Sequence, residues 1–240
     1  MNVLLLAAGE AADHDSYPLC LSEFDGEPLI AKQLSACAGL EAEKIIVAMP
    51  KTDVEKFHLD NVVRLLEPKS VVVKIENPTS GAACTALLAA GFIDNDKELL
   101  IINANELIDV NFADIVGGFR ERSLAAGVLT FKSVHPRYSY VKLDDSGFVM
   151  EAAEKRPISQ NATVGFYWYR HGHDFVNAAK NMIRKGASVQ GGFYICPVFN
   201  EFILEQKQVG SSVLDIKKYH PLKSEREIDR YEAVSQRSNT

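Results

Sequence analysis

The start of the chain constrains its fold most strongly. Residues 2–8 are almost entirely apolar and lead directly into Gly9, a pattern typical of a buried strand followed by a tight turn. An amphipathic helix is then predicted at 28–38. Since a continuous apolar strand belongs to a parallel sheet covered on both faces, this opening predicts an α/β protein.

Strand-like and helical segments alternate through the first half. Further strands are predicted at 44–48, 71–75 and 99–103, and further helices at 53–66 and 81–90. Residues 52–55 have a capping-box pattern, Ser80 is a candidate helix cap, and Gly91 is a candidate helix stop. The alternation predicts a doubly wound, mostly parallel central sheet of the Rossmann-like or GT-A-like kind.

The second half changes character and predicts a mixed sheet. Strands are expected at 127–132, 138–143, 148–152 and 163–169, with a hairpin turn at 144–147 and helices at 174–185 and 194–205. No internal repeat and no linker rich in Pro, Gly or Ser separates the halves. We therefore expect a single domain over 1–234 and a frayed tail at 235–240.

Composition excludes several classes of function. The net charge is −6 and no dense block of Lys and Arg occurs, which argues against nucleic acid as a partner. No apolar run reaches the length of a membrane span, so no membrane is expected, and the first residues lack the pattern of a signal peptide. The four cysteines have no CxxC spacing, which is typical of small core residues in a reducing cytoplasm.

The position of a ligand site follows from the predicted sheet. Ligands of open parallel sheets bind beyond the carboxyl ends of the strands, and we expect segments 7–9, 77–80, 103–106 and 154–155 to converge there. Small residues from Gly81 onward would let the N–H groups of a helix start approach a base or phosphate. Tight packing of this helix on the sheet explains the same spacing, so both interpretations stay open.

Ordered motifs run through almost the whole chain. They read GEPLI at 26–30, GAACTALLA at 81–89, INANELID at 102–109, LTFKSVHP at 129–136, EKRPIS at 154–159, ATVGFY at 162–167 and GFYICPVFNE at 192–201. Together they resemble the sugar-1-phosphate nucleotidyltransferase family, in its capsule and lipopolysaccharide branch. That family joins a nucleoside triphosphate to a sugar 1-phosphate and releases pyrophosphate.

The resemblance implies two sets of binding residues. The sugar-phosphate side would use Lys155 for the phosphate and Glu154 for sugar hydroxyls, while Ser139 narrows the pocket. The implied nucleotide-binding residues are Ala7, Ala8, Gly9, Ser80, Gly81, Ala82, Thr85 and Asn103. The implied sugar-phosphate-binding residues are Tyr138, Ser139, Glu154, Lys155, Thr163 and Gly165.

The implied catalytic positions differ from the family pattern. Ala11 replaces a glycine, Asp13 lies at or near the position of the loop arginine, and Leu19 replaces a lysine. Asn105 replaces the aspartate that holds Mg²⁺ in the family, and an amide carbonyl is a poorer ligand than a carboxylate. Asn105 and Lys155 are thus the catalytic positions by resemblance, and Mg²⁺ is the expected cofactor only if the protein is active.

No intact metal site is predicted. Asn105 and Glu106 are the candidates, but we expect Glu106 to face the mouth of the cleft and Asp109 to cap a short loop. His171 and His173 precede a predicted helix that Asp174 would cap, an interpretation preferred to a metal site.

Three functional hypotheses follow. The first is an active nucleotidyltransferase that makes nucleotide sugars for cell-surface polysaccharides with altered metal and phosphate ligands. The favoured one is a homologue that binds a nucleotide, a sugar phosphate or a protein partner with weak or lost turnover. The third is a GT-A-like glycosyltransferase, for which 103–105 has the Asp-x-Asp spacing with amides instead of acids. A homo-oligomer is left open.

Overall fold

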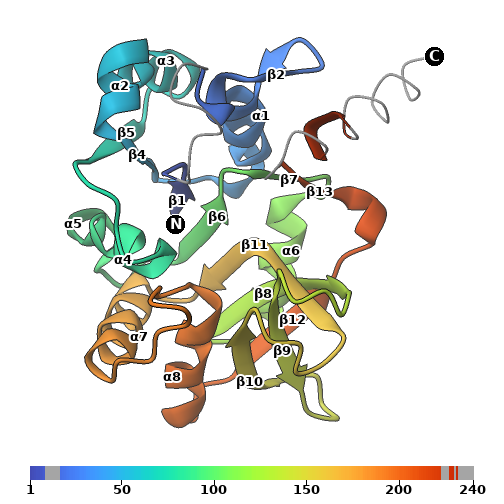
Figure 1. Cartoon of the computed structure of the whole chain (residues 1–240). Helices are drawn as coiled ribbons and strands as arrows, with labels where there is room; N and C mark the ends of the chain where they lie inside the picture. Colours follow the sequence, from blue (N-terminus) through green and yellow to red (C-terminus); the bar gives the residue numbers. More distant parts are fainter. Residues whose placement is uncertain (9–16, 223–226, 230, 232–240) are drawn as a thin grey trace.

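The central sheet organises the protein. The computed structural model describes residues 1–8, 17–222, 227–229 and 231, and within them nine strands form one sheet (Figure 1). Four strands make its parallel half, in the order β5-β4-β1-β6. Their bounds are Asn2–Leu6 for β1, Lys44–Pro50 for β4, Ser70–Ile75 for β5 and Leu99–Asn103 for β6.

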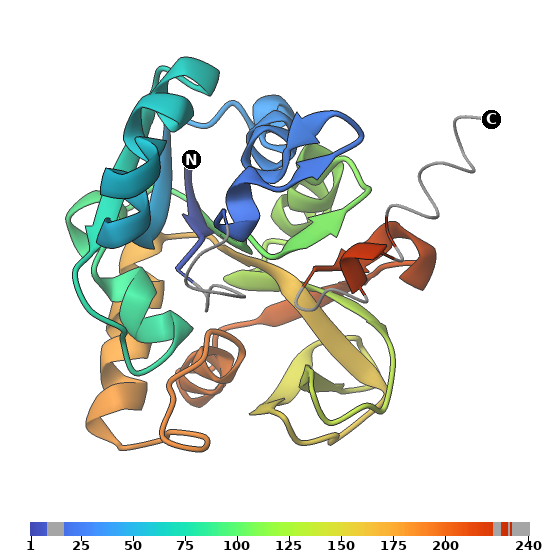
Figure 2. The same ribbon diagram turned by 45° about the horizontal axis from the view of Figure 1, so that its top comes forward.

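Strand β11 (Asn161–Tyr169) joins the parallel half to the mixed half. It runs antiparallel to β6 on one side and to β8 (Ala126–Lys132) on the other. Strand β12 (Val209–Val213) lies parallel to β8 at the edge. The hairpin of β9 (Ser139–Leu143) and β10 (Val149–Glu154) pairs with the start of β11, and Figure 2 shows β11 reaching it. The predicted doubly wound, mostly parallel sheet with a mixed half is confirmed.

Helices cover both faces of the sheet. Because side chains alternate along a strand, Val3 and Leu5 join one core cluster while Leu4 and Leu6 join the other. The first cluster packs under α1 (Leu29–Ala36), α2 (Lys51–Phe57), α3 (Leu59–Leu66) and α6 (Phe112–Glu121). The second packs under α4 (Ala82–Leu87), α5 (Ala90–Ile93), α7 (Gly172–Arg184) and α8 (Phe199–Leu204). Figure 1 shows α7 and α8 side by side, away from α1, α2 and α3.

Several predicted helix boundaries were wrong. The helix expected at 53–66 is two helices, because His58 adopts a left-handed φ of 53° between α2 and α3. Helix α2 begins after Pro50, so the expected capping box at 52–55 does not form. Gly91 lies inside α5 and is not a helix stop.

The sequence interpretation missed the helix α6 and several strands. The strands are β2 (Glu23–Phe24), β3 (Glu27–Pro28), β7 (Glu106–Ile108), β12 and β13 (Tyr219–Pro221). The helix expected at 194–205 is a 3-10 turn at Cys196–Val198 followed by α8. None of the helices in the described ranges is both long and apolar enough to cross a membrane. The tail predicted at 235–240 lies outside the described residues, and the single domain over 1–234 stays a prediction.

Candidate functional site

The ends of the central parallel strands bring the first predicted site residues together. Leu6 pairs in register with both Ala48 and Asn103, so β1 and β6 end at the same level, and β4 continues two residues further to Pro50. The amide of Ala7 donates to Ala48 O over 2.8 Å, and the amide of Ala104 donates to Leu6 O over 3.0 Å. Ala7 and Asn103 therefore lie at the carboxyl edge, as predicted, whereas Gly9 and the loop residues Ala11 and Asp13 lie outside the described residues.

The start of α4 is packed against a neighbouring loop. Gly81 has a φ of 109°, and a Cβ on it would lie 2.4 Å from Phe193 O. Phe193 N donates to Ser80 O over 2.7 Å, and Ala83 N donates to Phe193 O over 3.0 Å. The glycine is therefore required by close packing, which was one of the two interpretations of this segment.

The predicted helix cap at Ser80 was wrong. Gly81 occupies the N-cap position, where no side chain bonds to the helix amides. The hydroxyl groups of Thr79 and Thr85 instead bond to each other over 2.6 Å. Thr85, a predicted nucleotide ligand, is thus a buried side chain in this packed turn, and the neighbouring Ala82 is half-buried.

A buried carboxylate joins β7 to β11. Glu106 is 3% exposed, and its Oε2 accepts the amide hydrogen of Gly165 over 2.7 Å. Its Oε1 accepts weakly from Asn103 Nδ2 over 3.5 Å. A Cβ on Gly165 would lie 2.3 Å from that same amide nitrogen, so the glycine allows this close approach. The expectation that Glu106 faces the cleft mouth was wrong, because its carboxylate satisfies a buried backbone N–H.

The predicted roles of neighbouring residues also change. Asp109 does not cap a loop; its Oδ2 bonds to His220 Nε2 over 2.7 Å. Asn111 caps α6 instead, since its Oδ1 accepts from Ala113 N over 2.9 Å. Burial, and after it the charge of Glu106, raises the pKa of Tyr219 well above its ordinary value.

The residues around Asn105 do not fit a Mg²⁺ site. Mg²⁺ prefers a set of hard oxygen ligands, including carboxylates, in octahedral geometry. Asn105 is half-buried and offers at most an amide oxygen, while the carboxylate of Glu106 already accepts from Gly165. Within the described part of the chain, no group of three or more His, Cys, Asp or Glu side chains could hold a metal ion.

On the sugar side, the predicted residues of the β9–β10 hairpin meet. Ser139 Oγ donates to Glu154 Oε2, and the amide of Lys155 donates to Tyr138 O over 3.1 Å. Lys155 has a left-handed φ of 52°, and its Nζ donates to Tyr194 OH over 3.0 Å and to Gln190 Oε1 over 3.3 Å. The same Nζ lies 5.0 Å from the centroid of the Tyr194 ring.

A buried tyrosine of β11 lies within range of the charges of both Glu154 and Glu106. Tyr167 OH and Thr163 Oγ1 are 3.3 Å apart inside the protein. Burial raises the pKa of Tyr167 well above its ordinary value, and the charges of Glu154 and Glu106 act in the same direction. Gly165 lies between Thr163 and Tyr167 on β11. This strand therefore contacts both halves of the candidate site: Glu106 through the Gly165 amide, and the β9–β10 hairpin through its first residues.

Tyr194 and Gln190 were not predicted as site residues. They belong to the loop before α8, and only the fold brings them to Lys155, which is 39 and 35 positions away. The motif at 192–201 contained Tyr194, but nothing in its spacing indicated a contact with the lysine.

Leu19, which the family resemblance aligns with a lysine, is an apolar packing residue. It is partly buried against an apolar cluster that contains Phe24, Leu29, Leu107 and Leu222. The Leu19 side chain therefore contributes to packing in this cluster.

The histidine-containing segment before α7 has a structural explanation. His171, and not Asp174 as predicted, is the N-cap residue of α7. Asp174 instead accepts from Lys207 Nζ over 2.7 Å, and His173 lies within ion-pair distance of Asp96 and Asp174.

The fold is that of an open α/β sheet, and the candidate site lies at the carboxyl edge of its parallel half. The nucleotidyl transferase family matches residues 14–207, which is most of the chain. This chain therefore belongs to the nucleotidyl transferase family. No curated protein matches it significantly.

Solved structures share the fold across most or all of their length. A nucleoside-diphosphate-sugar pyrophosphorylase from Vibrio cholerae RC9 is 18% identical with a TM-score of 0.82, over 97% of this chain and 100% of that chain. A putative glucose-1-phosphate thymidylyltransferase from Bacillus anthracis, solved with sucrose, is 16% identical with a TM-score of 0.77, over 97% and 94%. A UDP-glucose pyrophosphorylase complexed with UDP-glucose is 12% identical with a TM-score of 0.76, over 99% and 98%.

Proposed function

We propose that this chain binds a nucleotide, a sugar phosphate or both in the cleft at the carboxyl edge of the sheet, with catalysis weak or lost. The proposal rests on the contacts among the predicted sugar-phosphate residues at the end of the β9–β10 hairpin. Ser139 bonds to Glu154, and Lys155 is held by Tyr138, Tyr194 and Gln190. A cation and a carboxylate at adjacent positions suit a phosphate and sugar hydroxyls.

The residues at the implied catalytic positions support the proposal of weak turnover. Phosphoryl transfer depends mainly on positioning and on cations that neutralise developing charge. Leu19 packs in an apolar cluster, and Asn105 lies where the family resemblance implies a metal-binding acid. A single lost donor of this kind costs roughly 10²–10³ in rate.

Binding in this proposal does not depend on Mg²⁺. The family resemblance implies a Mg²⁺ ion held by a strand-end aspartate, which would neutralise phosphate charge. Here the acid nearest to that position accepts a hydrogen bond from the Gly165 amide. We therefore expect affinity for a sugar phosphate to come from Lys155 and to change little with Mg²⁺.

The biological setting rests on the motifs. The segments at 129–136 and 192–201 support the capsule and lipopolysaccharide branch and a role in polysaccharide precursor metabolism. A cytoplasmic location fits the cysteines, since Cys20, Cys37, Cys84 and Cys196 are all free.

A calorimetric binding screen tests the proposal. The full chain is titrated with glucose 1-phosphate, UDP-glucose, dTDP-glucose and common nucleoside triphosphates, each with Mg²⁺ and with EDTA. We expect at least one sugar phosphate or nucleotide sugar to bind in both conditions. Absence of binding by every compound of the panel would contradict the proposal.

A matched pair of lysine variants locates the binding. Lys155→Met removes the cation at the hairpin end, whereas Lys142→Met removes an exposed cation from β9 of the same hairpin. We expect Lys155→Met to weaken sugar-phosphate binding about tenfold or more, and Lys142→Met to leave it unchanged. Equal effects of both variants would indicate non-specific attraction.

A further inference from the structure

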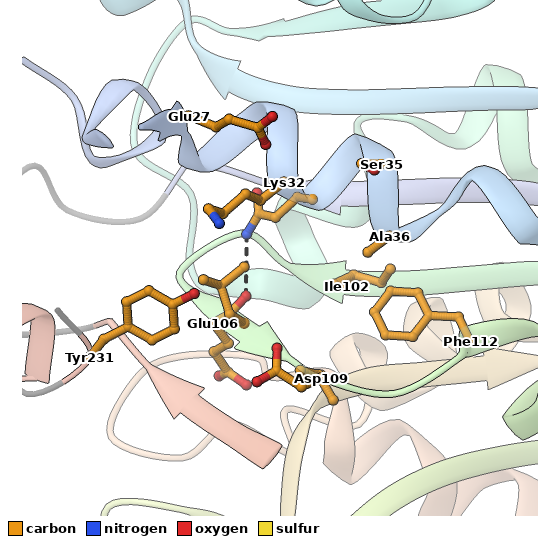
Figure 3. A pocket seen from close by; sticks show the side chains of 12 residues that line it. Glu27, Lys32, Ser35, Ala36, Ile102, Glu106, Asp109, Phe112 and Tyr231 are labelled. Atoms are coloured by element: carbon orange, nitrogen blue, oxygen red, sulfur yellow. Dashed lines mark hydrogen bonds between the residues drawn. The ribbon is translucent and has the colours of Figure 1, made fainter. Parts of the chain in front are cut away.

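Two cavities lie away from the sugar-phosphate residues. Figure 3 shows the first, which has a volume of about 350 Å³ and lies between α1, β7 and the start of α6. Glu106 and Asp109, which line it, already bond to other residues of the chain, so this lining indicates no ligand. The second has a volume of about 280 Å³ and is a groove beside β5. Its lining comes from α3 and β5: Asp60, Arg64, Ser70, Val71, Val72 and Lys74.

Strand β5 forms an edge of the central sheet. Among the described residues it pairs with β4 alone, in unbroken register over its six residues, and it lies far from the β9–β10 hairpin (Figure 1). The other outer strands are less regular. The register of β10 shifts between Val149 and Glu151, and β12 receives a bridge from Phe148. A regular edge strand offers unpaired N–H and C=O groups and is a template for pairing with another chain.

The ladder identifies which backbone groups of β5 face outward. The amide of Ala7 donates to Ala48 O, so Ala48 faces β1 and the preceding Val47 faces β5. Val47 is in register with Val72, and in a parallel ladder it bonds to the two neighbours of that residue. The N–H and C=O of Val72 therefore point away from β4. The amide of Ser70, two residues earlier, fits this alternation because it donates over 3.0 Å to the loop before β5.

Antiparallel pairing with a second β5 suits this edge. A two-fold axis at Val72 creates a pair in which each Val72 donates to the other and accepts from it. Lys74 then lies opposite Ser70 of the second copy, and its amide donates to that carbonyl group. This register forms about four backbone hydrogen bonds. It also keeps the two Lys74 residues about 13 Å apart along the strands.

The charges on α3 favour the same arrangement. Asp60 Oδ2 lies 3.8 Å from Lys74 Nζ, so Asp60 is level with Lys74. Arg64 lies one helical turn further, next to Val63, whose carbonyl group accepts from Ser70 Oγ over 3.4 Å. Arg64 is exposed and forms no ion pair with a described residue. Since the two-fold axis exchanges the levels of Lys74 and Ser70, Asp60 of each copy comes level with Arg64 of the other.

We propose that the edge of β5 and the groove beside α3 form a homodimer interface, in which two copies of this chain pair β5 antiparallel about a two-fold axis at Val72. Backbone pairing alone suits any strand, whereas the order of charges on α3 matches a second copy. A contact of this kind uses the same patch on both copies, so assembly stops at the dimer. None of the predicted nucleotide or sugar-phosphate residues lines the groove.

Sedimentation velocity of the full chain tests the proposal. Measurements over about 5–500 μM cover the affinities of small interfaces, which one strand and one helix from each copy would form. We expect a monomer–dimer equilibrium whose dimer fraction rises across this range. A chain that stays monomeric at every concentration would overturn the proposal and leave the edge to a strand of a different protein.

Two charge variants locate the interface. Arg64→Asp makes both charged positions of α3 in the groove acidic, and Asp60→Arg makes both basic, so each variant should weaken its own dimer about tenfold or more. An equimolar mixture of the two restores opposite charges across the axis, and we expect it to form heterodimers about as readily as the wild type dimerises. Arg184→Asp, the same change at an exposed position of α7, should leave the dimer unchanged.

The fluorescence of the buried Trp168 checks that each variant keeps the native fold. With folded variants, dimers that persist in both Arg64→Asp and Asp60→Arg would show that another surface is used. A mixture that stays monomeric would contradict the two-fold pairing at Val72.

Discussion

Replacing Glu106 distinguishes two possible roles of its carboxylate, a structural hydrogen-bond acceptor and a metal ligand. In Glu106→Ala the amide of Gly165 loses the acceptor that lies 2.7 Å away, in a position that is 3% exposed. A hydrogen bond to a charged group contributes about 1.5–3 kcal/mol, and a buried N–H left without a partner costs a similar amount. We therefore expect a loss of about 2–3 kcal/mol in the free energy of unfolding, or roughly 4–12 °C in melting temperature for a chain of this size.

Urea unfolding followed by the fluorescence of Trp168 measures this loss, because that single tryptophan is fully buried. Glu106→Gln retains an oxygen acceptor for Gly165 and should lose less stability than Glu106→Ala. Asp109→Ala is the control, since its side chain is 60% exposed and its contact with His220 lies at the surface; its effect should stay within about 0.5 kcal/mol. The contrary result would be a Glu106→Ala variant as stable as the wild type in EDTA and less stable than the wild type only when Mg²⁺ is present. Glu106 would then be a metal ligand, and the reasoning would be wrong.

Other predictions concern packing and titration. Gly165→Ala should lower the free energy of unfolding in urea by about 1–3 kcal/mol, because the new Cβ would overlap Asn103. Gly117→Ala, with open space around it in α6, should be neutral or stabilising. Equal effects of the two variants would contradict the packing argument. Burial raises the pKa of Cys20 and of Cys37 from 9.0 to about 12, so the folded state keeps protons that the unfolded state releases. Stability is then complete below pH 9 and falls as the pH rises toward 12, by about 1.4 kcal/mol per thiol at pH 10, and Cys37→Ala should remove its share of that slope. In native protein, DTNB should label the half-buried Cys84 well before Cys20, Cys37 and Cys196, which fast labelling of all four would refute.

The sheet was predictable because its strands are continuous apolar runs. Segments such as 44–48 and 99–103 can be buried on both faces only in a covered parallel sheet, and β4 and β6 lie there. The short strands β7 and β13 were missed because they pair with each other from distant parts of the chain. Local patterns also failed at His58, where a left-handed backbone divides an otherwise helical run.

The candidate site could be predicted only in part. The rule that ligands bind beyond the carboxyl ends of parallel strands located Asn103, and the motifs indicated Glu154 and Lys155. The structure brings Ser139 to Glu154 and Tyr194 to Lys155. The inward direction of Glu106 depends on the amide of Gly165, which is 59 positions away, and no local pattern carries that information. The same holds for Tyr194 beside Lys155, since that contact requires the packed tertiary structure.

The most direct test of weak or lost catalysis is the rate of pyrophosphate release. Full-length protein, free of contaminating pyrophosphatase, is incubated with Mg²⁺, a sugar 1-phosphate that it binds and each common nucleoside triphosphate. The family resemblance implies that Leu19 and Asn105 replace a lysine and a metal-binding aspartate. On that basis we expect a rate at least about 10²-fold below the usual enzyme range of about 1–10³ s⁻¹. Turnover within that range would contradict the account and show that other residues carry the chemistry.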